Sequence, residues 1–192
     1  MTKNSAQGSR RTRYYGVLFK VALIGVFAAL AFLSTTFLRI PLPVSGGYFN
    51  VGDTFVMASA ALFGPTVGFW VGLIGPTLSD AIGYPQFIPA TAIIKSFEGL
   101  IIGWICYSNS GLVSPGRCLS GLGIGGTIIV AGYFLFEAYI YPVVGQFSPF
   151  FNVTNLGMAV EEIVPNFVQA GISVLLAFGM WKLFKGRSRS TQ

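Results

Sequence analysis

Apolar runs recur along the chain from position 17 to position 186, and breaks rich in glycine and proline separate them. A run of about 18 or more residues with few charges is typical of a helix that crosses a lipid bilayer. The pattern predicts six helices, over residues 17–38, 52–63, 66–82, 90–107, 119–143 and 156–183. At ~1.5 Å per residue the second spans only part of a ~30 Å bilayer core. We therefore expect it to lie buried among the other helices or to tilt together with the third.

The composition agrees with a lipid environment. The chain of 192 residues is 53% hydrophobic and only 9% charged, with a mean hydropathy of +0.70. A surface in water requires far more charge than this. We predict an all-α integral membrane protein, with a membrane domain over 17–183 between basic cytoplasmic tails at 1–16 and 184–192. The first apolar run is longer than that of a signal peptide and lacks a convincing cleavage site, so we expect it to remain as the first span.

The positive charges predict the orientation of the chain. Lysine and arginine are retained on the cytoplasmic side of a membrane. All but two of the 12 lysines and arginines lie in or next to the two tails, or at Arg117 in the loop between the fourth and fifth helices. With six spans these positions share one side, whereas Arg39 lies outside and Lys95 lies within a helix. Both ends of the chain are therefore predicted to be cytoplasmic.

The acidic residues gather in the outer half of the predicted bundle. They come from five of the six helices and are Asp53, Asp80, Glu98, Glu137, Glu161 and Glu162. A charged side chain at membrane depth costs a few kcal/mol, so it is expected to face the protein interior or a water-filled cavity. The sequence thus predicts a polar pocket that opens to the outside.

Helical spacing brings further polar side chains beside these acids. Residues three or four positions apart share one face of a helix. On this basis Tyr133, Glu137 and Tyr141 form one stripe, and Glu162, Asn166 and Gln169 form another. Aromatic rings beside hydrogen-bonding groups suit a flat polar heterocycle. Our candidate substrate-binding residues are Asn50, Asp80, Tyr84, Lys95, Glu98, Tyr133, Glu137, Tyr141, Glu162 and Asn166.

Some of the polar residues also have simpler structural explanations. Asp53 or Asn50 could cap the second helix. Lys95 and Glu98 are three positions apart and could form a structural ion pair that offsets the cost of burying both. Glu137 lies deep in a hydrophobic helix, which favours a role in a pocket or between helices.

Small residues repeat at four-residue spacing on several helices. Gly64, Gly68 and Gly72 do so in the third helix, and Gly99 and Gly103 in the fourth. Such faces let helices approach closely in lipid, and we expect most of them to serve packing within the chain. The first helix carries its own small residues at Ala22, Gly25 and Ala29. Because this helix is terminal, its face could serve a partner instead.

The sequence also excludes several chemistries. It has no histidine, which rules out HExxH zinc sites and Ser-His-Asp triads. It has no GxxxxGK[ST] loop, so it cannot drive ATP-dependent transport by itself. We predict no catalytic residue, no metal site and no cofactor bound by this chain. A proton-coupled secondary transporter acting alone, with Glu137 and Glu162 as titrating groups, and a membrane enzyme acting through acidic residues stay open as alternatives.

Several segments together resemble a known family. They are YFNVGD from Tyr48, ALFGPTVGFWVGLIGPTLSDAIGY from Ala61, IIKSFEGLIIG from Ile93, AGYFLFEAYIY from Ala131 and EEIVPNFVQ from Glu161. In this order they resemble the substrate-binding S components of energy-coupling factor (ECF) vitamin transporters. The last two resemble the branch associated with hydroxymethylpyrimidine, pyridoxine or riboflavin. The likeness covers about residues 17–183.

The resemblance implies a function and a set of partners. It implies a six-helix protein of a prokaryotic cell membrane that captures a small vitamin in an outward-facing pocket, beneath a lid formed by residues 39–50. It implies assembly with a transmembrane coupling (T) subunit and two ATPase subunits, which use the ATP. The family's coupling motif AxxxA has its nearest match at Gly25-xxx-Ala29, so the resemblance implies a coupling contact at Ala22, Gly25 and Ala29.

Overall fold

The protein is a bundle of six helices with two short hairpins. The computed structural model describes residues 3–41, 48–108, 111–140, 142–143 and 156–189. Its helices are α1 (Lys3–Phe37), α2 (Asp53–Phe63), α3 (Pro65–Gly83), α4 (Ile88–Cys106), α5 (Pro115–Leu135) and α7 (Leu156–Arg189). A 3-10 turn, η1 (Pro85–Phe87), precedes α4, and a π-helical turn, η2 (Phe136–Ile140), extends α5. Strands β1 (Ile40–Pro41) and β2 (Tyr48–Phe49) form one hairpin, and β3 (Tyr107–Ser108) and β4 (Gly111–Leu112) the other.

The six predicted helices are confirmed, but several begin or end elsewhere. Helix α1 begins at Lys3 and so runs through the segment that we expected to be a basic tail. No proline interrupts that segment, and isolated glycines weaken a helix without ending it. Pro65 and Pro115 occupy the first positions of α3 and α5, where a missing N–H costs nothing. The prolines of the predicted turns therefore mark the helix starts.

Short helix α2 lies at the centre of the bundle. Nine of its 11 residues are buried, and it packs against α1, α3, α4 and α7. Gly64 joins it to α3 with φ +94°, a backbone conformation that favours glycine. The expectation that α2 is buried among its neighbours is confirmed. Among the described residues, four helical segments are long and apolar enough to cross a bilayer alone, at Gly16–Phe37, Pro85–Cys106, Pro115–Ile140 and Ala159–Phe184.

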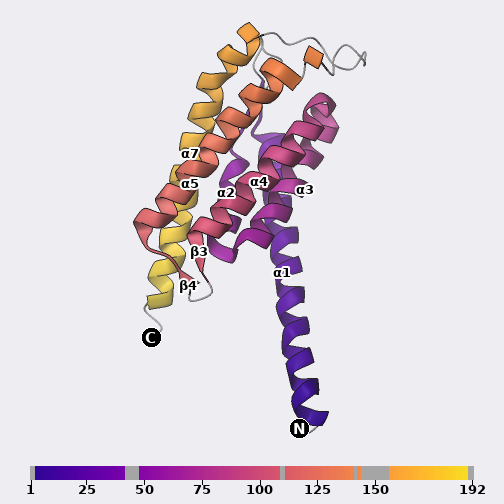
Figure 1. Cartoon of the computed structure of the whole chain (residues 1–192), viewed down its shortest axis with the longest axis vertical. Helices are drawn as coiled ribbons and strands as arrows, with labels where there is room; N and C mark the ends of the chain where they lie inside the picture. The colour runs from indigo at the N-terminus through magenta and orange to yellow at the C-terminus, as the bar shows by residue number, and fades with distance from the viewer. Residues whose placement is uncertain (1–2, 42–47, 109–110, 141, 144–155, 190–192) are drawn as a thin grey trace.

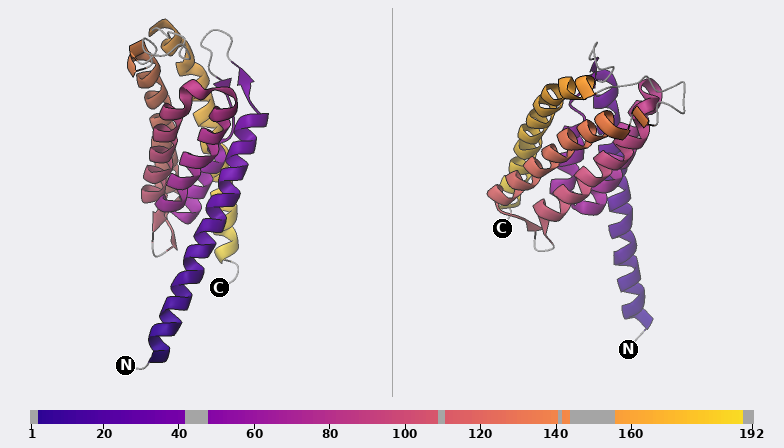
Figure 2. Two further views of the ribbon diagram at one scale, coloured as in Figure 1. Left: turned by 90° about the vertical axis from the view of Figure 1, so that its right-hand side faces the viewer. Right: turned by 45° about the horizontal axis from the view of Figure 1, so that its top comes forward.

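The chain ends lie at the same end of the bundle. Figure 1 shows both termini and the β3–β4 hairpin at the lower end, with the first part of α1 projecting beyond the other helices. The β1–β2 hairpin lies at the opposite end (Figure 2). Ten of the 12 lysines and arginines belong to the end that holds the termini, whereas Arg39 lies beside the β1–β2 hairpin and Lys95 within α4. The retention of positive residues in the cytoplasm therefore predicts that the end with the termini is cytoplasmic and that the β1–β2 hairpin is outside.

The glycine repeats bring helices α3 and α4 into backbone contact. A Cβ atom at Gly68 would collide with the carbonyl oxygen of Gly99, and a Cβ atom at Gly72 would collide with that of Lys95. At Gly103 it would collide with the backbone of Pro65. These glycines therefore serve packing within the chain, as predicted. The contact between Gly72 and the backbone of Lys95 also sets the position of Lys95 along α3.

Candidate functional site

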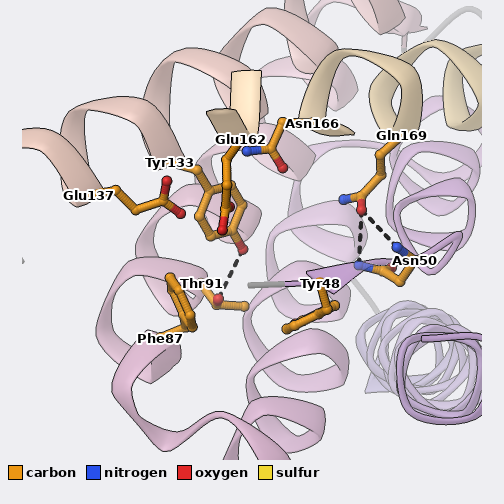
Figure 3. A pocket seen from close by; sticks show the side chains of 9 residues that line it. All are labelled: Tyr48, Asn50, Phe87, Thr91, Tyr133, Glu137, Glu162, Asn166 and Gln169. Atoms are coloured by element: carbon orange, nitrogen blue, oxygen red, sulfur yellow. Dashed lines mark hydrogen bonds between the residues drawn. The ribbon is translucent and has the colours of Figure 1, made fainter. Parts of the chain in front are cut away.

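A pocket lies near the outer end of the bundle. Strand β2, turn η1 and the start of α4 form one wall, while the end of α5 with η2 and the first part of α7 form the other. The empty space between these walls is about 310 Å³, including the part open to solvent. The side chains that line it, shown in Figure 3, are Tyr48, Asn50, Phe87, Thr91, Tyr133, Glu137, Glu162, Asn166 and Gln169.

Two buried glutamates lie next to each other in the pocket lining. Glu137 belongs to the π-helical turn η2, and its side chain is 2% exposed; Glu162, near the start of α7, is 5% exposed. Their carboxyl groups are close enough to interact electrostatically and to share a hydrogen bond. A π-helical turn shifts the direction of the side chains on a helix and is frequent at functional sites. The turn therefore brings a second carboxyl group to the one on α7.

Aromatic rings contribute to both walls of the pocket. Phe87 and Tyr133 pack edge to face with ring centres 6.5 Å apart. The Tyr133 hydroxyl and the Thr91 hydroxyl are hydrogen-bonded at 2.9 Å. This bond joins α5 to α4 and fixes the Tyr133 ring in the pocket. This part of the lining combines apolar ring faces with hydroxyl groups, as in sites for polar heterocycles.

Amide groups form the inner end of the pocket and are held in place by one another. The Asn50 backbone N–H donates to Gln169 Oε1 at 2.8 Å, and Gln169 Nε2 donates to Asp53 Oδ2 at 2.7 Å. Asn50 Oδ1 accepts from the Gly52 backbone N–H at 2.7 Å. Asn50 therefore satisfies a donor just before α2, whereas Asp53 has no capping role and instead binds Gln169.

A buried ion cluster lies outside the pocket lining. Lys95 Nζ is 2.6 Å from Asp53 Oδ1 and 3.6 Å from Glu98 Oε2. The predicted contact between Lys95 and Glu98 is present, but the closer partner of Lys95 comes from α2. The side chains of all three are at most 3% exposed. The cluster joins α2 to α4 beneath the pocket, and Gln169 connects it to α7.

Arg39, which follows α1, ties the β1–β2 hairpin to the end of α3. Its guanidinium lies 4.5 Å from the ring centre of Tyr48 and 4.7 Å from that of Tyr84. It also donates to the Ser79 carbonyl and hydroxyl oxygens. The Tyr48 hydroxyl donates to Asp80 Oδ1. Tyr48 lines the pocket, so these contacts hold one of the pocket walls in place.

Half of the ten candidate binding residues meet in the pocket. Asn50, Tyr133, Glu137, Glu162 and Asn166 line it. Lys95 and Glu98 lie in the ion cluster, and Asp80 and Tyr84 lie behind Tyr48. Tyr141 and residues 42–47 of the expected lid fall outside the described residues.

Four residues of the lining were absent from our candidates. They are Tyr48, Phe87, Thr91 and Gln169. Gln169 shares a helical stripe with Glu162 and Asn166, and this signal was sufficient to include it. No comparable signal marks Phe87 or Thr91, whose positions depend on how η1 and α4 pack against α5.

The small residues proposed for a partner lie on the outside of α1. Ala22, Gly25 and Ala29 are exposed, and nothing lies within 4 Å of a Cβ atom placed at Gly25. In the described part of the chain, no other helix packs over this face. It contains no group of three or more His, Cys, Asp or Glu side chains arranged to hold a metal ion.

Comparisons with known proteins agree with this architecture. A solved structure described as "Structure and mechanism of the S component of a bacterial ECF transporter" superposes with a TM-score of 0.58 over 90% of this chain and 97% of that chain, at 16% identity. At this identity the match shows the fold.

Two relatives illustrate the sequence matches. An "Uncharacterized protein in gap 3'region" of Pyrococcus woesei is 39% identical over 132 residues, which cover 69% of this chain and 86% of that protein. A "UPF0397 protein" of Leuconostoc citreum is 38% identical over 84 residues, and the alignment covers 44% of this chain and 45% of that protein.

A family model that matches most of the chain identifies the family. The family model described as "ECF-type riboflavin transporter, S component" matches residues 18–185. S components are transport subunits, and they work in association with an energy-coupling module. The chain therefore belongs to the ECF-type riboflavin transporter S component family, as a multi-pass prokaryotic membrane protein that is a transport subunit and not an enzyme.

Proposed function

We propose that this chain captures a small water-soluble vitamin or vitamin precursor from outside the cell, of the hydroxymethylpyrimidine, pyridoxine or riboflavin class. The observation that carries the proposal is the pocket at the outer end, where side chains from β2, η1, α4, α5, η2 and α7 converge. The aromatic rings of the lining support stacking, and the amides and carboxyl groups support recognition of the ring edge.

The driving force for uptake is proposed to come from partner subunits. The sequence has no nucleotide-binding GxxxxGK[ST] loop. A transmembrane coupling (T) subunit and two ATPase subunits would hydrolyse ATP and release the bound vitamin inside. The exposed face of Ala22, Gly25 and Ala29 on α1 is our candidate for the contact with the coupling subunit.

Binding without nucleotide tests the proposed function. The purified chain in detergent is titrated calorimetrically with hydroxymethylpyrimidine, pyridoxine and riboflavin in the absence of ATP. One of these is expected to bind at one molecule per chain, and Asn166→Leu in the pocket should weaken its binding about tenfold or more, because a lost pocket hydrogen bond leaves a polar ligand group unpaired. Absence of binding by all three would count against the proposal.

Substitution of Gly25 by leucine is expected to uncouple transport from binding. The side chain at this position meets open space in the isolated chain, so folding and vitamin binding should be unchanged. A close helix contact with the coupling subunit would be blocked by the added bulk, and ATP-dependent uptake should fall about tenfold or more. Uptake and binding are measured in parallel on the reconstituted complex.

Gly179→Leu provides the matched control for Gly25→Leu. Gly179 lies on α7 and is equally open, but it is remote from the small-residue face of α1. It should transport at the rate of the unmodified protein. Equal uptake by the Gly25 and Gly179 variants would show that the α1 face is not the coupling contact.

Substitution of Arg39 by leucine is expected to shorten the lifetime of the bound vitamin. The change removes two cation–π contacts and the hydrogen bonds to Ser79, so Tyr48 is held less firmly over the pocket. At about 0.5–1 kcal/mol for each of the two cation–π contacts, dissociation should be about 5- to 30-fold faster. Stopped-flow displacement measures the rate. Arg117→Leu, at the cytoplasmic end, should leave it unchanged.

A further inference from the structure

We propose that the ligand of this pocket is a positively charged or amine-bearing heterocycle, bound through Glu162 and Glu137, and not a neutral flavin. This inference rests on the proposed function, because it names the chemistry of the molecule that the pocket captures. Three observations support it: the charges around the pocket, the buried carboxyl oxygen of Glu162 that has no hydrogen-bond partner, and the aromatic lining.

The pocket lining is acidic without compensating basic groups. It contains two glutamates and neither a lysine nor an arginine. The nearest basic side chains lie behind the lining and already have partners: Lys95 lies between Asp53 and Glu98 and over the Tyr133 ring, and Arg39 lies between Tyr48 and Tyr84. Lys95 faces two carboxylates, so its cluster adds no net positive charge beside the pocket. A ligand with a positive charge is therefore favoured electrostatically.

Glu162 presents an unpaired oxygen to the pocket. The side chain is 5% exposed, and its Oε1 atom has no hydrogen-bond partner. Burying a polar group without a hydrogen bond is costly, and burying a charged one costs more. Figure 3 shows this carboxyl group directed into the pocket, beside Glu137 and Tyr133. An N–H group of a ligand would provide the missing donor and a charge-assisted hydrogen bond.

The aromatic lining favours the same class of ligand. Tyr48, Phe87 and Tyr133 contribute rings to the pocket, and the face of an aromatic ring attracts a cation. Arg39 lies 4.5 Å from the ring centre of Tyr48 and Lys95 lies 5.3 Å from that of Tyr133, which leaves a ligand cation the Phe87 ring and the second faces of the two tyrosines. The polar edge of a flavin presents a single N–H donor between two carbonyl acceptors. The N–H can pair with one carboxyl oxygen, but the flanking carbonyl groups would face the other oxygens of Glu137 and Glu162, which is unfavourable. An aminopyrimidine or a ring carrying an ammonium group offers donors to both carboxyl groups.

Two vitamins that differ in one group test this inference. Pyridoxamine and pyridoxine share a ring, but pyridoxamine carries an aminomethyl group where pyridoxine carries a hydroxymethyl group. These two probes, hydroxymethylpyrimidine with its amino group, and riboflavin are titrated into the full-length protein. We expect pyridoxamine to bind at least tenfold more tightly than pyridoxine, and riboflavin to bind most weakly of the four.

The Glu162→Gln variant identifies the group responsible. It should lower the affinity for pyridoxamine and hydroxymethylpyrimidine about tenfold or more and lower that for pyridoxine clearly less, since the amide keeps the shape but loses the charge. Glu161→Gln, at the exposed neighbouring position, should change neither. If Glu162→Gln does not fold, Glu137→Gln provides the same comparison.

The outcomes separate the inference from the function on which it rests. Riboflavin or pyridoxine as the tightest ligand, or unchanged pyridoxamine affinity in the glutamine variants, overturns the inference and leaves vitamin capture intact. Absence of binding by all four probes overturns the proposed function and the inference together.

Discussion

Replacing Lys95 by methionine is expected to destabilise the protein by about 3–5 kcal/mol. The change leaves Asp53 and Glu98 buried without their common positive partner, and removal of one member of a buried ion pair typically costs this much. The free energy of unfolding is measured in detergent by denaturant titration, with thermal unfolding as a second readout. The loss should extend to vitamin binding, because Asp53 also holds Gln169 of the pocket.

Removing the negative charges at the same time provides the decisive control. In the triple variant with Lys95→Met, Asp53→Asn and Glu98→Gln, no unpaired charge remains, and most of the lost stability should return. Lys20→Met, at an exposed position of α1, should have no effect. Wild-type stability of the single Lys95 variant would show that the cluster does not hold α2 to α4.

Replacing Gly99 by leucine is expected to abolish folding of the membrane domain. A Cβ atom at Gly99 would collide with the backbone of Gly68, and a backbone cannot move aside as a flexible side chain can. The expected destabilisation is at the upper end of single substitutions, about 4 kcal/mol or more. The readout is the fraction of extracted protein that elutes as a single symmetric peak in size-exclusion chromatography.

The control for Gly99→Leu is Gly171→Leu, on the outer face of α7. Nothing lies within 4 Å of a Cβ atom at Gly171, so its variant should elute as the unmodified protein does. A normal elution profile for Gly99→Leu would mean that α3 and α4 can separate without loss of the fold, and that their backbone contact is dispensable.

The fold could be predicted from the sequence because lipid imposes strong constraints. Spanning helices must be long and apolar, and their basic flanks must stay in the cytoplasm. The apolar runs and the glycine- and proline-rich breaks between them predicted all six helices, and the basic flanks predict the orientation. They gave the start of α1 incorrectly, because hydropathy marks where the chain enters lipid and not where the helix begins, which is Lys3.

The candidate site was predicted only in part, for geometrical reasons. Spacing along one helix identifies neighbours on that helix, so it paired Lys95 with Glu98 but could not supply Asp53 from α2. Similarly, Tyr48 belongs to no helix, and its position depends on the β1–β2 pairing and on Arg39. Contacts between elements that are far apart in the sequence can be identified only from the folded structure.

The π-helical turn was a further feature that the sequence pattern could not show. The predicted stripe of Tyr133 and Glu137 assumes regular α-helical geometry, but Glu137 lies in η2. Both residues nevertheless line the pocket.

Uptake into liposomes tests the central claim most directly, that this chain captures a vitamin and other subunits drive its transport. Radiolabelled vitamin, identified by the binding titration, is offered to liposomes that hold the chain alone or together with its coupling subunit, the two ATPase subunits and internal ATP. We predict one bound molecule per chain without accumulation for the chain alone, and accumulation for the complete complex with ATP. Accumulation by the chain alone, driven by a proton gradient, would contradict the account.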